Sequence, residues 1–125
     1  ITKEMLDEGL HYPVMNGRAV FTHAVKRMSE SLTNTLKKNE IKIEDVDLFL
    51  FHQANLRIND KVGEYMGIDS SKVFNTIQNY GNTTAATIPI GMRDAIKAGK
   101  LKKGMTVGFA AFGAGFTWGS GVIKY

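Results

Sequence analysis

The sequence predicts an α/β fold in which a mostly parallel sheet, covered by helices, ends in an antiparallel hairpin. Three observations predict it. Apolar residues recur with helical spacing over 17–38, as in a long amphipathic helix. Residues 48–51 form an unbroken apolar run, which is typical of a strand buried on both faces of a parallel sheet. Helix-like and strand-like segments then alternate along the chain, and that order builds a parallel sheet.

The first element is an amphipathic helix over 17–38. Asn16 precedes it as a candidate N-cap, and Lys37 and Lys38 lie where the negative end of the helix dipole favours cations. The residues predicted to share its apolar face are Val20, Phe21, Ala24, Val25, Met28, Leu32 and Leu36. We expect this face to cover the sheet.

Two strands and a helix are predicted next. The buried strand 48–51 is followed by a helix over 56–66, which Gly67 ends. A short second strand is predicted at 72–76.

The C-terminal third predicts one more helix and two strands. Residues 83–98 are predicted to form a helix that ends at Gly99. Apolar residues cover most of its circumference in the first turns, which predicts that the helix is buried. Pro89 lies deeper in this segment than the usual first-turn position. The sequence therefore fits either a helix that is kinked at Pro89 or a helix that starts later than residue 83. Strands 107–112 and 118–125 are joined by a glycine-rich turn and form the hairpin.

Length and composition exclude several classes of protein. The 125 residues suit one domain, and no apolar run approaches the roughly 20 residues that span a bilayer. No signal peptide is visible, so we expect a cytoplasmic protein. The absence of cysteine excludes disulfides, thiolate metal sites and a thiol nucleophile from these residues. The net charge of +4 favours acidic partners without choosing among them.

Polar or glycine-rich stretches follow the predicted strands at 52–55, 79–83 and 113–116. Because parallel strands end at one edge of a sheet, we expect these three stretches to converge there on a ligand site. Each also has a plainer explanation. His52 can be a hydrogen-bonded structural residue, Asn82 a helix N-cap, and Gly-Ala-Gly a tight turn. The glycine turn lacks the spacing and context of a dinucleotide site.

Three motifs carry a resemblance to a known family. His-Gln-Ala-Asn-Leu-Arg-Ile at 52–58, Tyr-Gly-Asn-Thr-Thr-Ala-Ala at 80–86 and Phe-Gly-Ala-Gly-Phe-Thr-Trp-Gly at 112–119 resemble type III β-ketoacyl-[acyl-carrier-protein] synthases. The resemblance reaches from 15–21 to the last residue. It implies the C-terminal half of a thiolase-like fold. The single His and Asn differ from the two histidines of elongating ketoacyl synthases.

The resemblance implies a Cys-His-Asn active site. His52 and Asn82 would be two of its members, and the cysteine would belong to an N-terminal half that we expect this chain not to contain. The implied reaction is condensation of an acyl-CoA primer with malonyl-ACP to give 3-oxoacyl-ACP, with no cofactor or metal. Phe112, Gly113 and Ala114 would shape the site and its oxyanion loop.

Further residues match positions that line the family's entrance for CoA and acyl carrier protein. These are Gly17, Arg18, Val20, Phe21, Ala54, Asn55 and Arg57. The implied partners are acyl carrier protein, acyl-CoA, the N-terminal half and, at full length, a second subunit. We expect the isolated chain to be inactive and to expose an apolar patch. The alternatives are a non-catalytic module that binds carrier protein or CoA and, ranked last, a small nucleic-acid binder. We expect neither a nucleic-acid nor a membrane partner.

Overall fold

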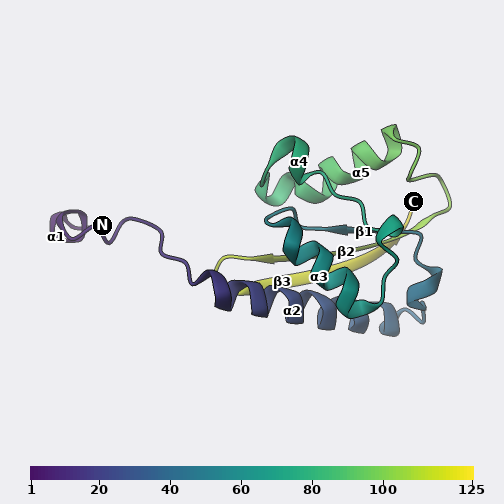
Figure 1. Cartoon of the computed structure of the whole chain (residues 1–125), viewed down its shortest axis with the longest axis horizontal. Coiled ribbons are helices and arrows are strands. Elements are labelled where there is room, and N and C mark those ends of the chain that lie inside the picture. Colours follow the sequence, from purple (N-terminus) through teal and green to yellow (C-terminus); the bar gives the residue numbers. More distant parts are fainter.

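A three-stranded mixed sheet lies between two helical layers in the computed structural model, which describes residues 1–125 (Figure 1). Strand β1 (Leu48–Phe51) pairs in parallel with β2 (Thr106–Gly113), and β2 pairs antiparallel with β3 (Thr117–Lys124). The predicted α/β class, the buried first strand and the final hairpin are confirmed. The sheet has one parallel and one antiparallel pair.

Helices α2 (Gly17–Lys38) and α3 (Leu56–Met66) cover one face of this sheet (Figure 1). The bounds of both helices are those predicted. Asn16 Oδ1 accepts a hydrogen bond from the Ala19 N–H at 3.0 Å, so the predicted cap of α2 is confirmed. Met28 and Leu32 of α2 are almost fully buried in the core cluster that also holds Phe49 of β1. The amphipathic face of α2 therefore covers the sheet as predicted.

Helix α5 (Thr87–Lys97) packs on the other face, over β1, and follows a 3-10 turn at Thr84–Ala86. Its late start places Pro89 in the first turn, where a backbone N–H has no helical partner. A buried helix, however, is a wrong prediction for this chain. Only Thr87, Gly91 and Ala95 are buried, because α5 contacts the sheet along one face.

The predicted strand at 72–76 is also wrong. A 3-10 turn at Ser70–Lys72 leads into a single parallel bridge between Val73 and Phe49. The chain then leaves the sheet and forms the short helix α4 (Ile77–Tyr80). The buried side chain of Gln53 accepts hydrogen bonds from the backbone N–H groups of Thr76 and Ile77. These groups are therefore not available to extend a β ladder.

Two further short helical segments lie outside the prediction. The 3-10 turn Ile43–Asp45 precedes β1, and α1 (Lys3–Asp7) lies on an arm that reaches away from the sheet (Figure 1). Helix α1 buries no residue, so it does not contribute to the core. No helix of the structure is both long enough and apolar enough to cross a bilayer.

Candidate active site

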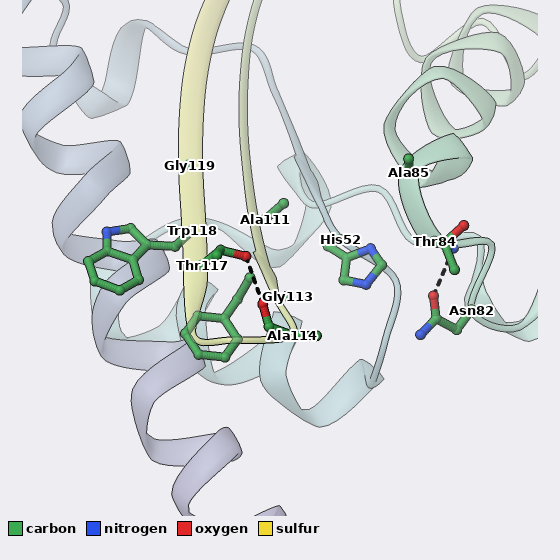
Figure 2. A pocket seen from close by; sticks show the side chains of 11 residues that line it. His52, Asn82, Thr84, Ala85, Ala111, Gly113, Ala114, Thr117, Trp118 and Gly119 are labelled. Atoms are coloured by element: carbon green, nitrogen blue, oxygen red, sulfur yellow. Dashed lines mark hydrogen bonds between the residues drawn. The ribbon is translucent and has the colours of Figure 1, made fainter. Parts of the chain in front are cut away.

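The parallel pairing of β1 and β2 brings two of the predicted stretches to one edge of the sheet. His52 follows β1, and its N–H donates to Ala110 O of β2 at 2.9 Å. Gly113 ends β2 at the same edge, and the loop with Asn82 follows α4. All three stretches line one pocket of about 590 Å³, which we call the central pocket (Figure 2). The predicted convergence is confirmed.

A second pocket of about 540 Å³ lies next to the first and is called the arm pocket. Five residues line both pockets: His52, Asn82, Phe112, Gly113 and Ala114. The arm pocket adds Val20, Ala54 and residues 13–16 at the base of the arm. His52 and Asn82 therefore face space on two sides.

His52 is half-buried, and one of its ring nitrogens is engaged. Nδ1 lies 3.2 Å from Oγ1 of the buried Thr87, while Nε2 makes no hydrogen bond within the chain. Burial lowers the pKa of His52 below its ordinary value of 6.5, so the imidazole is neutral at neutral pH. A neutral ring with Nδ1 engaged leaves Nε2 for a ligand.

Asn82 is oriented by its own loop. Its Oδ1 accepts the Thr84 N–H at 2.9 Å, and its amide nitrogen is turned away from Thr84, on the side nearer His52 (Figure 2). Thr84 adopts a left-handed conformation with φ of 51°, which is strained for a β-branched residue. The amide N–H groups of Asn82 are thus free to donate.

Gln53 is a structural part of the site to which the sequence assigned no role. It is 2% exposed, and its Nε2 donates to Phe51 O at 2.9 Å and to Asn75 Oδ1 at 3.1 Å. Its Oε1 accepts from the N–H groups of Thr76 and Ile77, both at 2.9 Å. Gln53 therefore joins the end of β1 to the first turn of α4. A signal was present, since a glutamine beside a buried strand requires partners.

The glycine-rich turn closes the pocket. Gly115 and Phe116 have positive φ angles of 72° and 52°, whereas Ala114 does not. An alanine at 114 is therefore unstrained, and Thr117 Oγ1 donates to its carbonyl at 3.1 Å. The Phe112 side chain is 8% exposed, and its ring lies against Phe116.

Five predicted entrance residues line neither pocket: Gly17, Arg18, Phe21, Asn55 and Arg57. A Cβ at Gly17 would meet nothing within 4 Å, so no close approach requires glycine there. Phe21 packs against the core, and Asn55 Oδ1 caps α3 by accepting the Arg57 N–H at 3.0 Å. Arg18 and Arg57 are exposed. The predicted binding roles of these five residues stay predictions.

The lining of the central pocket can donate hydrogen bonds but contains no carboxylate. Its nitrogen-bearing side chains are those of His52, Asn82 and Trp118, and the indole nitrogen of Trp118 points away from the other two residues (Figure 2). A pair of neutral donors without an adjacent anion suits an oxygen atom that gains negative charge. The geometry therefore fits oxyanion stabilisation better than proton abstraction by a carboxylate.

Comparisons with known proteins show the family and the fold of the chain. The family model described as "3-Oxoacyl-[acyl-carrier-protein (ACP)] synthase III C terminal" matches residues 36–125. The β-ketoacyl-[acyl-carrier-protein] synthase III of Clostridium perfringens is 48% identical over 114 residues, which are 91% of this chain and 35% of that protein. The chain thus spans about a third of the length of the curated relatives it matches.

Solved structures give the same result. The 3-oxoacyl-[acyl-carrier-protein] synthase III of Aquifex aeolicus superposes with a TM-score of 0.89 at 44% identity, over 93% of this chain and 38% of that one. The corresponding structure from Pseudomonas aeruginosa superposes with a TM-score of 0.90 at 32% identity, over 100% and 38%. The fold of this chain is that of the corresponding part of both proteins.

Proposed function

The chain belongs to the 3-oxoacyl-[acyl-carrier-protein] synthase III family, and on that premise we propose that it supplies the hydrogen-bond donors for a decarboxylative condensation. The substrates would be an acyl-CoA primer and malonyl-ACP, and the product 3-oxoacyl-ACP, which starts fatty-acid synthesis. One observation carries the proposal. His52 Nδ1 and Asn82 Oδ1 are both engaged within the chain, and the opposite nitrogens face one pocket.

The donors act on the malonyl thioester. When its bond to the carboxylate breaks, carbon dioxide leaves and the electron pair moves through the α-carbon onto the thioester oxygen. We expect that oxygen to accept hydrogen bonds from His52 Nε2–H and the Asn82 amide. Each such donor contributes about 10²–10³ to the rate. Decarboxylation itself generates the carbanion, so a pocket without a carboxylate is sufficient.

The acyl group of the primer is first transferred from CoA to a cysteine, with release of the CoA thiol, and the enolate carbon then attacks the carbonyl carbon of that cysteine thioester. The new carbon–carbon bond forms, the carbonyl oxygen becomes a transient oxyanion, and its collapse expels the cysteine thiolate. The backbone N–H of Ala114, in the turn beside the pocket, is our candidate donor for this second oxyanion. These 125 residues contain no cysteine, so the thiol must come from outside them.

The arm pocket is our candidate for the pantetheine arm of both substrates. It shares His52 and Asn82 with the central pocket and is walled by the apolar side chains of Val20 and Ala54. Arg18 and Arg57 are exposed and would attract phosphate groups or the acidic carrier protein.

The test uses a chimeric enzyme. This chain replaces the matching C-terminal part of the Clostridium perfringens synthase III, and 3-oxoacyl-ACP formation is measured. We expect His52→Ala and Asn82→Ala each to lower kcat by about 10²–10³. His11→Ala, in the exposed arm, is the control and should leave kcat unchanged. Full activity of His52→Ala would contradict the proposal.

A second experiment separates this proposal from a binding module. If the isolated chain binds holo-acyl carrier protein, and Arg57→Glu abolishes binding while Asn82→Ala does not, binding is independent of the donor pair. An active chimera would then still require His52. An inactive chimera that binds carrier protein would favour the non-catalytic module.

A further inference from the structure

Thr87 connects His52 to a second hydroxyl group. Its Oγ1 lies 3.2 Å from His52 Nδ1 and 3.2 Å from Thr83 Oγ1. Thr87 is 2% exposed and is the first residue of α5, so packing against the sheet holds its side chain in place. Three groups thus form one short chain of hydrogen bonds behind the imidazole.

This chain can run in two directions, because each hydroxyl has one proton to donate. In one direction His52 Nδ1–H donates to Thr87, and Nε2 presents a lone pair to the pocket. In the other, Thr83 donates to Thr87 and Thr87 donates to Nδ1. The proton of the neutral ring then lies on Nε2 and points into the pocket. Only the second direction makes His52 a donor.

We infer that Thr87 is a positioning residue that donates to His52 Nδ1 and so holds the imidazole in the Nε2–H tautomer. The inference rests on the proposed function, which requires a donor at Nε2. The inference needs two conditions, and the structure meets both: Thr83 lies where it can donate to Thr87, and burial favours the neutral ring.

The choice of partner determines what the histidine can do. A carboxylate at Nδ1 accepts a hydrogen bond from the ring N–H and leaves the Nε2 lone pair as a base, as in serine-protease triads. A hydroxyl at Nδ1 can donate instead, which leaves Nε2 as a hydrogen-bond donor. Thr87 thus suits a histidine that stabilises an oxyanion.

The tautomer can be measured by 15N NMR of histidine-labelled chain at about pH 8, where a neutral ring is expected. The His52→Gln variant assigns the His52 signals. We expect Nε2–H in the wild type and in Thr87→Ser, which keeps the hydroxyl. In Thr87→Val the proton should be shared between the two nitrogens. Wild-type Nδ1–H, or identical signals in wild type and Thr87→Val, would overturn the inference. The wild-type result decides even if Thr87→Val fails to fold.

Kinetics of the chimeric enzyme give an independent test. Thr87→Val should lower kcat by about tenfold with KM unchanged, which is the effect of one hydrogen bond. Thr33→Val is the matched control, because it makes the same change at an exposed threonine of α2 that lines neither pocket. Both it and Thr87→Ser should stay within about twofold of wild type. If Thr87→Val left kcat unchanged while His52→Ala lowered it, the role of Thr87 would be refuted and the proposed function would stand. Activity in His52→Ala would refute the proposed function instead.

Discussion

Replacing Gln53 by leucine tests whether the polar link behind the site stabilises the fold. Gln53 is buried, and it holds the end of β1 and the start of α4 together with four hydrogen bonds of 2.9–3.1 Å. Leucine has a similar volume but no polar atom. The substitution therefore removes the hydrogen bonds with little change in packing.

The size of the effect follows from the groups left behind. The N–H groups of Thr76 and Ile77 would lose their acceptor, and Thr76 is buried. An unpaired buried donor costs about 1–3 kcal/mol, and Ile77 is only partly buried. We therefore expect Gln53→Leu to lower the free energy of unfolding by about 3 kcal/mol, a large part of the 5–15 kcal/mol typical of a domain.

Urea unfolding followed by circular dichroism measures this change. The control is Gln78→Leu, because Gln78 is exposed and donates one hydrogen bond, to Asn75 O at 3.0 Å. It should change the free energy of unfolding by less than about 0.5 kcal/mol. A loss below about 1 kcal/mol in Gln53→Leu, or equal losses in both variants, would refute the reasoning.

Three further predictions concern the pocket lining. Thr84→Asn should raise the free energy of unfolding, measured by urea unfolding, by about 1 kcal/mol, because asparagine tolerates the φ of 51°. A lower free energy of unfolding in this variant would contradict backbone strain at Thr84. Ala114→Gly should leave kcat of the chimera unchanged. It should lower the free energy of unfolding by about 0.5–1 kcal/mol, because glycine raises the entropy of the unfolded chain. A higher kcat would contradict an unstrained Ala114. Burial lowers the folded-state pKa of His52, so the unfolded chain binds more protons below 6.5 and stability falls as pH falls through that value. When the pH is lowered from about 8 to about 5, the free energy of unfolding of His52→Gln should fall less than that of the wild type.

The elements that the sequence predicts best are those with local signals at both ends. Helix α2 has an N-cap at Asn16 and a continuous apolar face, and α3 ends at Gly67, whose φ is 68°. Strand β1 is four consecutive apolar residues, all buried. Caps, periodicity and burial agree in these segments, so their bounds follow from the residues alone.

Segments 72–76 and 83–98 differ from prediction for reasons that lie far away in the sequence. The first leaves the sheet after one bridge because Gln53, more than twenty positions earlier, binds its backbone. The second is apolar on a side that no other element of this chain covers. Neither a distant hydrogen-bond acceptor nor an uncovered face can be derived from local periodicity.

The residues of the site likewise divide into those that the sequence could predict and those that it could not. The positions of His52 and the 113–116 turn follow from the rule that parallel strands end at one edge, whereas Asn82 lines the same pocket from the loop after α4 and not from the predicted strand at 72–76. Thr87 could not be found by that rule, because it is a buried residue in the first turn of a helix and does not follow a strand. Its role depends on one side-chain distance, which no sequence pattern encodes.

Both candidate donors are oriented by partners within the chain, and these partners lie in different elements. Thr87 of α5 engages the far side of the His52 ring, and the Thr84 backbone engages the far side of the Asn82 amide. The donors are thus fixed before any substrate binds, which is the condition under which hydrogen bonds stabilise developing charge most strongly. Since Thr84 adopts a strained conformation to do so, the strain at φ 51° is itself an argument for function: a loop selected only for stability would place glycine or asparagine there.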